Sequence, residues 1–383
     1  MLLPFIALLA AQDISGSVFL DSNGNGRRDP GEAGVAGVAV SDQDTVVVTA
    51  ADGSYRLRLG GNGLIYVSVP SGFRSVGPFW RTAEQAARAG AAFALAVTSP
   101  MTSFRFVHAS DTHISEQSAP RTRLLRSMVD SIRAAFVLVT GDLVRDALRV
   151  GETEARGYYD LFARERAAFT TPVHTTPGNH EIFGIETHLS KVSPTHPLFG
   201  KAMYRSYFGP EYYSFNMGGV HFISLNTVDI HEGWYYGHVD SRQLRWLERD
   251  LATVPAGMPV VTFNHIPFYS TADQLGGYED GPPAPTLIKL GEKLVFRHAV
   301  SNADSVLSVL AGRSHVLALG GHVHIAERIS FEREGQVTRF ENSAATVGPS
   351  STGGRVFPSG FSVYQVTSGR VSEARFVRLP AAP

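Results

Sequence analysis

The chain has 383 residues, of which 43% are hydrophobic and 18% charged, with no cysteine and a formal net charge of −1. This composition excludes a disordered or fibrous protein, and the lack of cysteine excludes disulfides, thiolate metal sites and a cysteine nucleophile. The near-neutral charge excludes a global basic field for nucleic acid or an anionic membrane, although bound metal ions could still create a local positive site.

The first eleven residues, Met1 to Ala11, form an apolar run that ends in small residues. The run is too short to span a bilayer and is typical of the hydrophobic part of a signal peptide. We therefore expect a signal peptide over residues 1–11 and a secreted or periplasmic protein. A buried first strand is the alternative interpretation, and no other stretch approaches the length of a transmembrane helix.

Residues 12–99 contain short β-type runs separated by Gly, Asp and Asn, and only Thr82–Ala91 has an Ala-rich helical pattern. Several short strands at this spacing predict a β-sandwich domain, which a linker at Ser99-Pro100 would close. The expected strands are Ile14–Leu20, Val35–Val40, Thr45–Thr49, Ser54–Leu59, Leu64–Val69 and Ala92–Val97.

Within this domain, residues 21–32 match the pattern D-x-[DN]-x-[DN]-G-x5-E of a calcium loop. Short oxygen-bearing side chains alternate along the loop, Gly26 allows its sharp turn and Glu32 can close it bidentately. The domain resembles the β-sandwich repeats of bacterial adhesins and carboxypeptidase-regulatory-like domains, and calcium would make it rigid. A plain turn rich in Asx and Gly is the alternative. The predicted calcium ligands are Asp21, Asn23, Asn25, Arg27, Asp29 and Glu32.

After residue 100, short strands alternate with helical patterns, which predicts an α/β domain over residues 100–383 whose later strands are partly antiparallel. The expected helices are residues 121–134, 152–169, 241–251 and 299–311. The expected strands are Phe104–Ala109, Phe136–Thr140, Pro172–Thr176, Val220–Asn226, Val260–Asn264, His315–Leu319, Ile325–Ser330, Val337–Asn342, Ser362–Val366 and Glu373–Leu379.

Five of these strands end in residues of metal-ligand type. Binding sites in open α/β sheets form at the carboxyl ends of the strands, so we expect these side chains to lie together. Asp, His and Asn suit Mn, Fe or Zn, and a carboxylate can bridge two ions about 3.5–4 Å apart. The strand-end sequences are Asp111-Thr112-His113, Gly141-Asp142, Gly178-Asn179-His180-Glu181, Asn264-His265 and Gly320-Gly321-His322-Val323-His324.

In this order, the five blocks resemble the motifs DxH, GDxx, GNH[DE], a lone His and GHxH of the calcineurin-like metallophosphoesterases, over residues 104–379. The resemblance implies a four-layer α/β/β/α domain that hydrolyses a phosphomonoester or phosphodiester with a hydroxide bridging two metal ions. One ion would be held by Asp111, His113, Asp142 and His324, and the other by Asp142, Asn179, His265 and His322. His180 would protonate the leaving group or stabilise its charge.

Two positions depart from the purple acid phosphatases of this family. Arg145 stands where those enzymes have a tyrosine ligand and His113 where they have glycine, so no tyrosinate–iron colour is expected. His113 is shared with many diesterases, which favours a diester. The substrate, small-molecule or macromolecular, and the oligomeric state stay open, and no Lys/Arg stripe for nucleic acid is evident. A cell-surface binding module with a non-catalytic metal site is the alternative function.

The other histidines receive different interpretations. His108, His174 and His221 lie within predicted strands and are expected to pack in the core. His188 and His196 lie in the long insertion of residues 182–210, where a solvated loop is favoured over a substrate contact.

Overall fold

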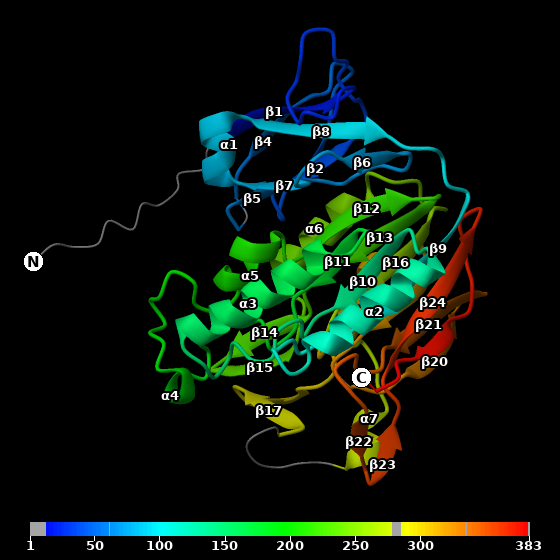
Figure 1. The fold of residues 1–383 in the computed structure, drawn as a ribbon. Coiled ribbons are helices and arrows are strands. Elements are labelled where there is room, and N and C mark those ends of the chain that lie inside the picture. The colour runs from blue at the N-terminus through cyan, green and yellow to red at the C-terminus, as the bar shows by residue number, and fades with distance from the viewer. Residues whose placement is uncertain (1–12, 61, 278–284, 334, 382–383) are drawn as a thin grey trace, which may run out of the picture. The chain divides into compact units, whose positions relative to one another are not determined.

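The computed structural model describes residues 13–60, 62–277, 285–333 and 335–381, and the chain divides into two compact units (Figure 1). The first unit comprises the described residues up to Ser99 together with Arg245–Val254, and the second comprises the remainder from Pro100 onward. The predicted signal peptide, residues 1–11, lies outside the described residues. Within those residues, no helix has the length and apolar character needed to cross a bilayer.

The first unit contains two four-stranded sheets with a shared core, which confirms the predicted all-β domain. Val18 and Phe93 from one sheet and Val40 and Ile65 from the other belong to a single buried cluster. Their burial explains the alternation of apolar and polar residues along the strands. One sheet has the order β4 (Ser54–Arg58), β1 (Asp13–Leu20), β8 (Ala91–Val97), β6 (Phe73–Ser75), and the other β3 (Val46–Val48), β2 (Ala39–Ser41), β5 (Leu64–Val67), β7 (Trp80–Thr82).

Two expectations for this unit need correction. The strand expected over Val35–Val40 begins only at Ala39, because Gly37 adopts a positive φ of 75° and forms a turn. Part of helix α6 (Ser241–Leu251), expected with the second domain, groups with the first unit. Trp246 on this helix is fully buried, and its Nε1 donates to the Tyr66 hydroxyl at 3.0 Å. The helix α1 (Ala83–Ala89) has the predicted position and begins in a capping box.

The second unit contains two six-stranded sheets, which confirms the predicted α/β class. One has the order β11 (Val173–Thr176), β10 (Phe136–Thr140), β9 (Ser103–Ala109), β24 (Gly360–Thr367), β25 (Arg370–Val371), with β26 (Arg375–Arg378) also paired to β24. The other has the order β12 (Tyr213–Met217), β13 (Val220–Ser224), β16 (Pro259–Phe263), β19 (Ser314–Gly320), β21 (Gln336–Asn342), β20 (Glu327–Arg333). Both sheets mix parallel and antiparallel pairs.

These two sheets pack face to face through aromatic side chains. Phe106 and Phe136 of the first sheet meet Phe222 of the second with ring centroids 5.5 and 5.1 Å apart, both edge to face. The opposite face of the first sheet carries the alternate residues, such as Val107 and Val137, which pack with the helices α2 (Ala119–Ile132) and α3 (Glu152–Ala167) (Figure 1). Because both faces are covered, the inner strand β10 is a nearly continuous apolar run.

Short elements that the sequence pattern did not predict surround the carboxyl ends of the strands or lie in connections. They are the helices α4 (Thr187–Ser190), α5 (Ala202–Phe208) and α7 (Ala272–Gly276), and the hairpins β14 (Val228–His231) with β15 (Trp234–Gly237), β17 (Leu287–Leu290) with β18 (Lys293–Phe296), and β22 (Ser350–Thr352) with β23 (Arg355–Phe357). The helix expected over residues 299–311 is shorter, α8 (Ala303–Leu310), because Val300 instead forms a bridge with Gly237.

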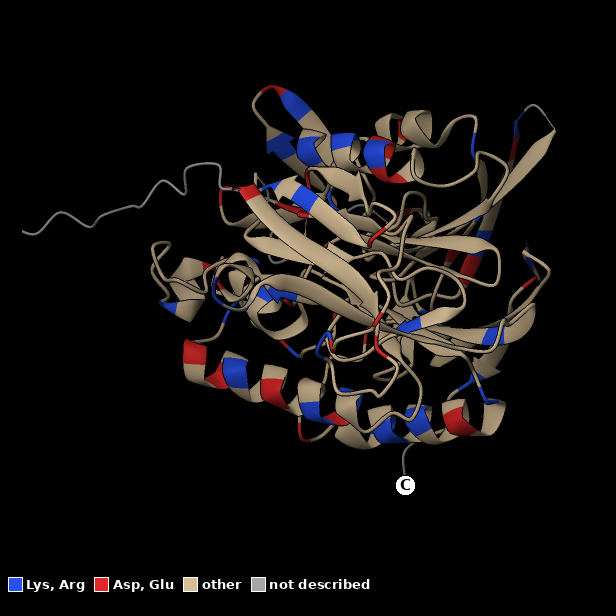
Figure 2. Ribbon diagram, turned by 90° about the horizontal axis from the view of Figure 1, so that it is seen from above, with Lys and Arg blue, Asp and Glu red and all other residues tan. Residues whose placement is uncertain are grey.

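Charged residues are dispersed over this fold. In the view of Figure 2, helices carry Lys and Arg as well as Asp and Glu. Helix α3, for example, has Glu152 and Glu154 in its first turn and Arg164 and Arg166 in its last. This distribution complements the helix dipole and gives a mixed surface.

Candidate metal centre

The predicted ligands lie together at the carboxyl ends of strands from both sheets of the second unit. The loops after β9, β10 and β11 of the first sheet carry Asp111, His113, Asp142, Asn179 and His180. The loops after β16 and β19 of the second sheet carry His265, His322 and His324. The centre is therefore formed where the ends of two packed sheets meet, not at the edge of a single sheet.

The backbone at this centre adopts an uncommon conformation. Five of the predicted ligand residues have a left-handed backbone, which costs about 1–3 kcal/mol at a non-glycine residue and persists only where surrounding contacts enforce it. Backbone hydrogen bonds enforce it here, since His113 N donates to the Asp142 carbonyl at 2.9 Å and His322 N to Asp111 Oδ2 at 3.1 Å. The φ angles are 54° at Asp111, 37° at His113, 49° at Asp142, 71° at His322 and 59° at His324.

One cluster joins Asp111, His113, Asp142 and His324. The Nε2 atoms of His113 and His324 are 3.2 Å apart, and His324 Nε2 lies 3.1 Å from Asp111 Oδ1. His113 Nε2 also lies 3.6 Å from Asp142 Oδ2. Ring nitrogens and carboxylate oxygens therefore converge on one small volume, as the ligands of a metal ion would.

A second cluster joins Asp142, His265 and His322, and Asn179 adds an amide oxygen to it. His265 Nε2 lies 3.2 Å from Asp142 Oδ1 and 3.0 Å from Asn179 Oδ1. His322 Nδ1 lies 3.2 Å from His265 Nε2. Asp142 is thus common to both clusters, with Oδ2 toward the first and Oδ1 toward the second.

The electrostatics of the clusters suit cations. Burial lowers the pKa of His113 to about 4 and that of His322 well below its usual value, so both rings are neutral at pH 7. Burial alone would raise the pKa of Asp142, but His265 and His180 outweigh it and hold that pKa well below its usual value. Asp111 Oδ1 is buried and accepts no hydrogen bond. A neutral imidazole and an unsatisfied carboxylate oxygen are the donors that a divalent metal takes, so these residues fit two metal ions.

Glycines and one buried carboxylate keep the loops in place. A Cβ atom on Gly178 would lie 2.2 Å from Asp142 N, and one on Gly321 would lie 2.9 Å from the Thr140 carbonyl oxygen, so only glycine fits these positions without a shift of the backbone. The Glu181 carboxylate is fully buried and accepts hydrogen bonds from the backbone amides of Leu143, Val144 and Gly178 at 2.7, 3.0 and 2.6 Å. Glu181 therefore ties the Asp142 loop to the Asn179 loop.

His180 lies beside the clusters, and one of its ring nitrogens makes a hydrogen bond to the backbone. Its Nδ1 donates to the Arg145 carbonyl at 2.5 Å, which leaves Nε2 on the side of Asp142 Oδ2, 3.9 Å away. Its ring meets His113 edge to face at 4.5 Å. Arg145, at the position of the tyrosine in purple acid phosphatases, contacts His180 through its backbone, and its side chain is exposed.

The clusters form the floor of a cavity of about 360 Å³. Its walls include Tyr235 from β15, Asp273 from α7 and His298, none of which the sequence pattern indicated. These residues come from a short hairpin, a short helix and a loop, and no motif or regular spacing marks them.

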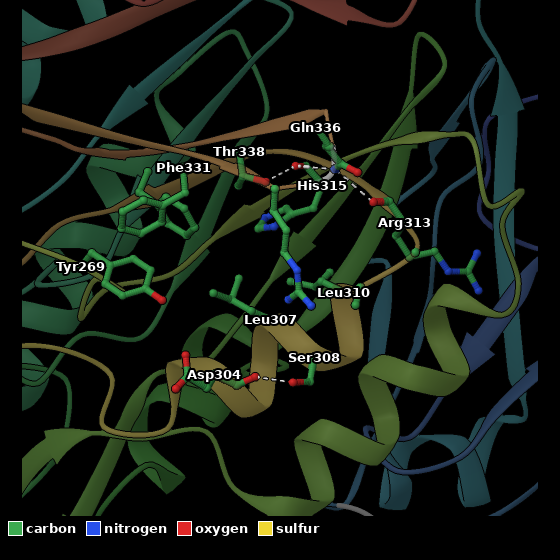
Figure 3. Close-up of a pocket in the computed structure, with 14 residues that line it drawn as sticks. Tyr269, Asp304, Leu307, Ser308, Leu310, Arg313, His315, Phe331, Gln336 and Thr338 are labelled. Atoms are coloured by element: carbon green, nitrogen blue, oxygen red, sulfur yellow. Dashed lines mark hydrogen bonds between the residues drawn. The ribbon is translucent and has the colours of Figure 1, made fainter.

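A second cavity of about 510 Å³ lies away from the metal centre, between α8 and the strands β19 to β21 (Figure 3). Tyr269 and Phe331 line one side of it. Its polar side chains are largely bonded to backbone: Gln336 Nε2 donates to the carbonyls of Arg313 and His315, and Ser308 Oγ donates to the Asp304 carbonyl. The cavity shares no lining residue with the metal centre and brings no cluster of catalytic groups together.

The predicted calcium loop satisfies its oxygen atoms internally. Both Asp21 oxygens accept from backbone amides, at 2.6 and 2.7 Å, and Glu32 Oε1 accepts from another at 2.8 Å. The amide nitrogens of Asn23 and Asn25 each donate to Asp29 Oδ2 at 2.7 Å. Among the described residues, the metal-type clusters of carboxylates and histidines are the two of the second unit. Calcium binding to this loop stays a prediction.

The remaining histidines agree with their interpretation. His108 is buried with Nε2 3.0 Å from Thr140 Oγ1, His174 stacks on Phe215 at 4.1 Å, and His221 is fully buried, so all three belong to the core. His188 is exposed, whereas His196 Nε2 lies 3.2 Å from Glu152 Oε2.

Comparison with known proteins finds a family model, related phosphatases and similar structures. The family model described as calcineurin-like phosphoesterase matches residues 104–326. Purple acid phosphatase 21 from Arabidopsis thaliana is 31% identical over 177 residues, which cover 44% of this chain and 34% of that protein. Acid phosphatase type 7 from Homo sapiens is 33% identical over 150 residues, which cover 36% of this chain and 30% of that protein. The chain therefore spans about a third of the length of these relatives.

A dimetal phosphatase from Danio rerio is similar in structure, with a TM-score of 0.46 and 16% identity over 72% of this chain and 99% of that chain.

Proposed function

Because this chain belongs to the calcineurin-like phosphoesterase family, we propose that it hydrolyses a phosphate ester at a centre of two metal ions. The family and the two phosphatase relatives support a phosphoric ester hydrolase. The observation that supports the proposal most is the position of Asp142, whose two oxygens face two separate clusters of ligand atoms. A carboxylate shared in this way is what a pair of ions needs.

The ligand sets that we propose are those of the two clusters. Asp111, His113, Asp142 and His324 would hold one ion, and Asp142, Asn179, His265 and His322 would hold the other. When bound, two ions of Mn, Fe or Zn supply a water nucleophile at neutral pH and neutralise charge on the phosphoryl oxygens. The protein keeps the ligands in place through the left-handed loops and through the Glu181 carboxylate.

His180 is the residue that we assign to the leaving group. Its Nδ1 proton is held by the Arg145 carbonyl, and its backbone amide donates to Asp142 Oδ1 at 2.9 Å, so ring and backbone are both fixed. His180 lines the cavity, and its Nε2 lies 3.9 Å from Asp142 Oδ2. With a proton on Nε2, the imidazolium can deliver it to the oxygen that leaves when the ester bond breaks.

We further propose a diester over a monoester as the preferred substrate, a secreted or periplasmic location and a structural calcium ion in the first unit. His113, which many diesterases share, supports the first of these, and the apolar run of residues 1–11 supports the second. The match of residues 21–32 to a calcium loop supports the third. A binding module without turnover is the competing function.

Hydrolysis of bis-p-nitrophenyl phosphate and p-nitrophenyl phosphate with added Mn²⁺ tests the proposal. We expect the parent protein to hydrolyse the diester faster. Asp142→Ala should lose bound metal and activity together, whereas His180→Ala should keep its metal and lose activity. A parent protein that binds two ions per chain and turns over neither ester, nor any of a broad ester panel, would favour the binding module instead.

A further inference from the structure

His298 contacts a proposed metal ligand although no motif marks it. Its Nδ1 lies 2.7 Å from Nε2 of His322, and the two rings are 4.9 Å apart with an interplanar angle of 23°. His298 also lines the cavity above the metal centre. The contact is a short hydrogen bond between two imidazoles, so one ring donates and the other accepts.

The second cluster decides which ring donates. His322 turns its Nδ1 toward that cluster, since this atom lies 3.2 Å from His265 Nε2. A neutral imidazole that gives the lone pair of Nδ1 to a metal ion carries its proton on Nε2. That proton then points at His298 Nδ1, which must accept it. Partners of this kind fix the tautomer and the ring orientation of a metal-binding histidine.

The surroundings of His298 hold it at this place. The preceding residue, Arg297, is only 1% exposed, and its guanidinium lies 4.0 Å from the ring centre of Tyr235 and 5.0 Å from that of Trp234. Its backbone amide donates to the Thr286 carbonyl at 2.9 Å. The Tyr235 ring in turn meets the His322 ring edge to face at 5.7 Å. Arg297 and the β14–β15 hairpin therefore lock the segment that carries His298 against His322.

We propose that His298 is a positioning residue for the second metal site: it accepts the Nε2 proton of His322 and keeps Nδ1 of His322 free for the ion. This role rests on the proposed two-metal function, because it requires His322 to be a ligand. His298 does not itself contact the ion in this role. It acts through His322, and the segment of Arg297 and His298 thereby supports the metal centre.

The proposal is tested by the affinity of the second site for Co²⁺ or Mn²⁺, measured by competition with a chelator. In His298→Asn, the side-chain oxygen takes the place of Nδ1 and can still accept the proton of His322. In His298→Ala, no acceptor remains. Loss of such a partner weakens metal binding by about 10- to 100-fold. We therefore expect that loss in His298→Ala, and an affinity within about threefold of the parent in His298→Asn. The exposed His188→Ala serves as the control that removes a histidine elsewhere.

A second readout does not depend on turnover. With two equivalents of Mn²⁺, the exchange-coupled electron paramagnetic resonance signal of an ion pair should be present in the parent and in His298→Asn but lost in His298→Ala. Parental affinity in His298→Ala, or an equal loss in both variants, would overturn the role of His298. A parent that shows the coupled signal but hydrolyses no ester would instead contradict the proposed function and leave the role of His298 standing.

Discussion

Replacement of Gly178 by alanine should damage the metal centre without removing any ligand. The added Cβ would lie 2.2 Å from Asp142 N, 2.3 Å from Asp142 Oδ1 and 2.9 Å from Glu181 Oε2, whereas ordinary contact begins at 3.4 Å. Asp142 cannot move freely, because its Oδ1 accepts from the amide of His180 at 2.9 Å. The Asp142 and Gly178 loops must therefore separate by about 1 Å, a displacement that can cost about 100-fold in rate.

This loss corresponds to about 2.7 kcal/mol of transition-state stabilisation. We also expect the overpacking to lower the free energy of unfolding by about 1–3 kcal/mol. The assay is kcat/KM on bis-p-nitrophenyl phosphate with saturating Mn²⁺, together with the metal content and a urea unfolding curve.

The matched control is Gly157→Ala. Gly157 lies exposed within α3, and a Cβ there meets nothing within 4 Å. This substitution should leave activity unchanged and stabilise the helix by about 1 kcal/mol. If Gly178→Ala kept the kcat/KM of the parent, the close approach of the two loops would not be what holds Asp142 in place.

Three further outcomes are expected. Glu181→Gln turns one acceptor oxygen into a donor that faces a backbone amide. The free energy of unfolding of the metal-free protein, measured in urea, should therefore fall by about 1–3 kcal/mol. An unchanged urea midpoint would contradict the role of Glu181 in tying the two loops together. In the metal-free protein, burial lowers the pKa of His265 but Asp142 outweighs it and raises that pKa to about 9, above the ordinary 6.5. The stabilisation that the His265–Asp142 pair gives the folded protein should thus be complete below pH 6.5 and disappear as the pH rises through 9. Metal binding at pH 7.5 should release about one proton, which calorimetry in two buffers measures. No proton release at pH 7.5 would refute this protonation state. Arg121→Ala should lower the free energy of unfolding by about 1.5–3 kcal/mol, because the buried guanidinium donates to Ser359 Oγ at 2.6 Å and to the Pro380 carbonyl. A urea midpoint equal to that of the parent would show that these contacts with the C-terminal segment do not stabilise the fold.

The strands that carry the ligands could be predicted because their signals are local. Phe136–Thr140, for example, is apolar up to Val139 and is followed at once by Gly141 and Asp142, and the structure has a strand with these bounds. Burial of both faces of a strand requires this kind of run, and the chain must turn sharply where the run ends. The helix expected over residues 299–311 shows the limit of such signals, since Val300 forms a bridge with Gly237, far away in the sequence.

The groups that make up the two clusters could also be anticipated, because each ligand stands next to a strand end and carries a donor atom suited to metal ions. The left-handed backbone of five of these residues could not be anticipated from the sequence. Five non-glycine residues with positive φ carry a cost that persists only where contacts enforce it, and hydrogen bonds between the loops, both within one sheet and across the two sheets, keep them there.

By itself, then, the sequence determined the α/β class, the preceding all-β unit and the residues that converge on the centre. It could do so because the spacing of hydrophobic residues, the positions of glycines and the donor atoms of the side chains are properties of short segments. The tertiary structure alone decided that two sheets share the centre and that Glu181 ties the Asp142 loop to the Asn179 loop. It also decided that His298 and Tyr235 stand beside His322. Tyr235 comes from a short hairpin and His298 from an irregular segment, and the place of both is fixed by packing against distant parts of the chain, which leaves no periodic trace in the sequence.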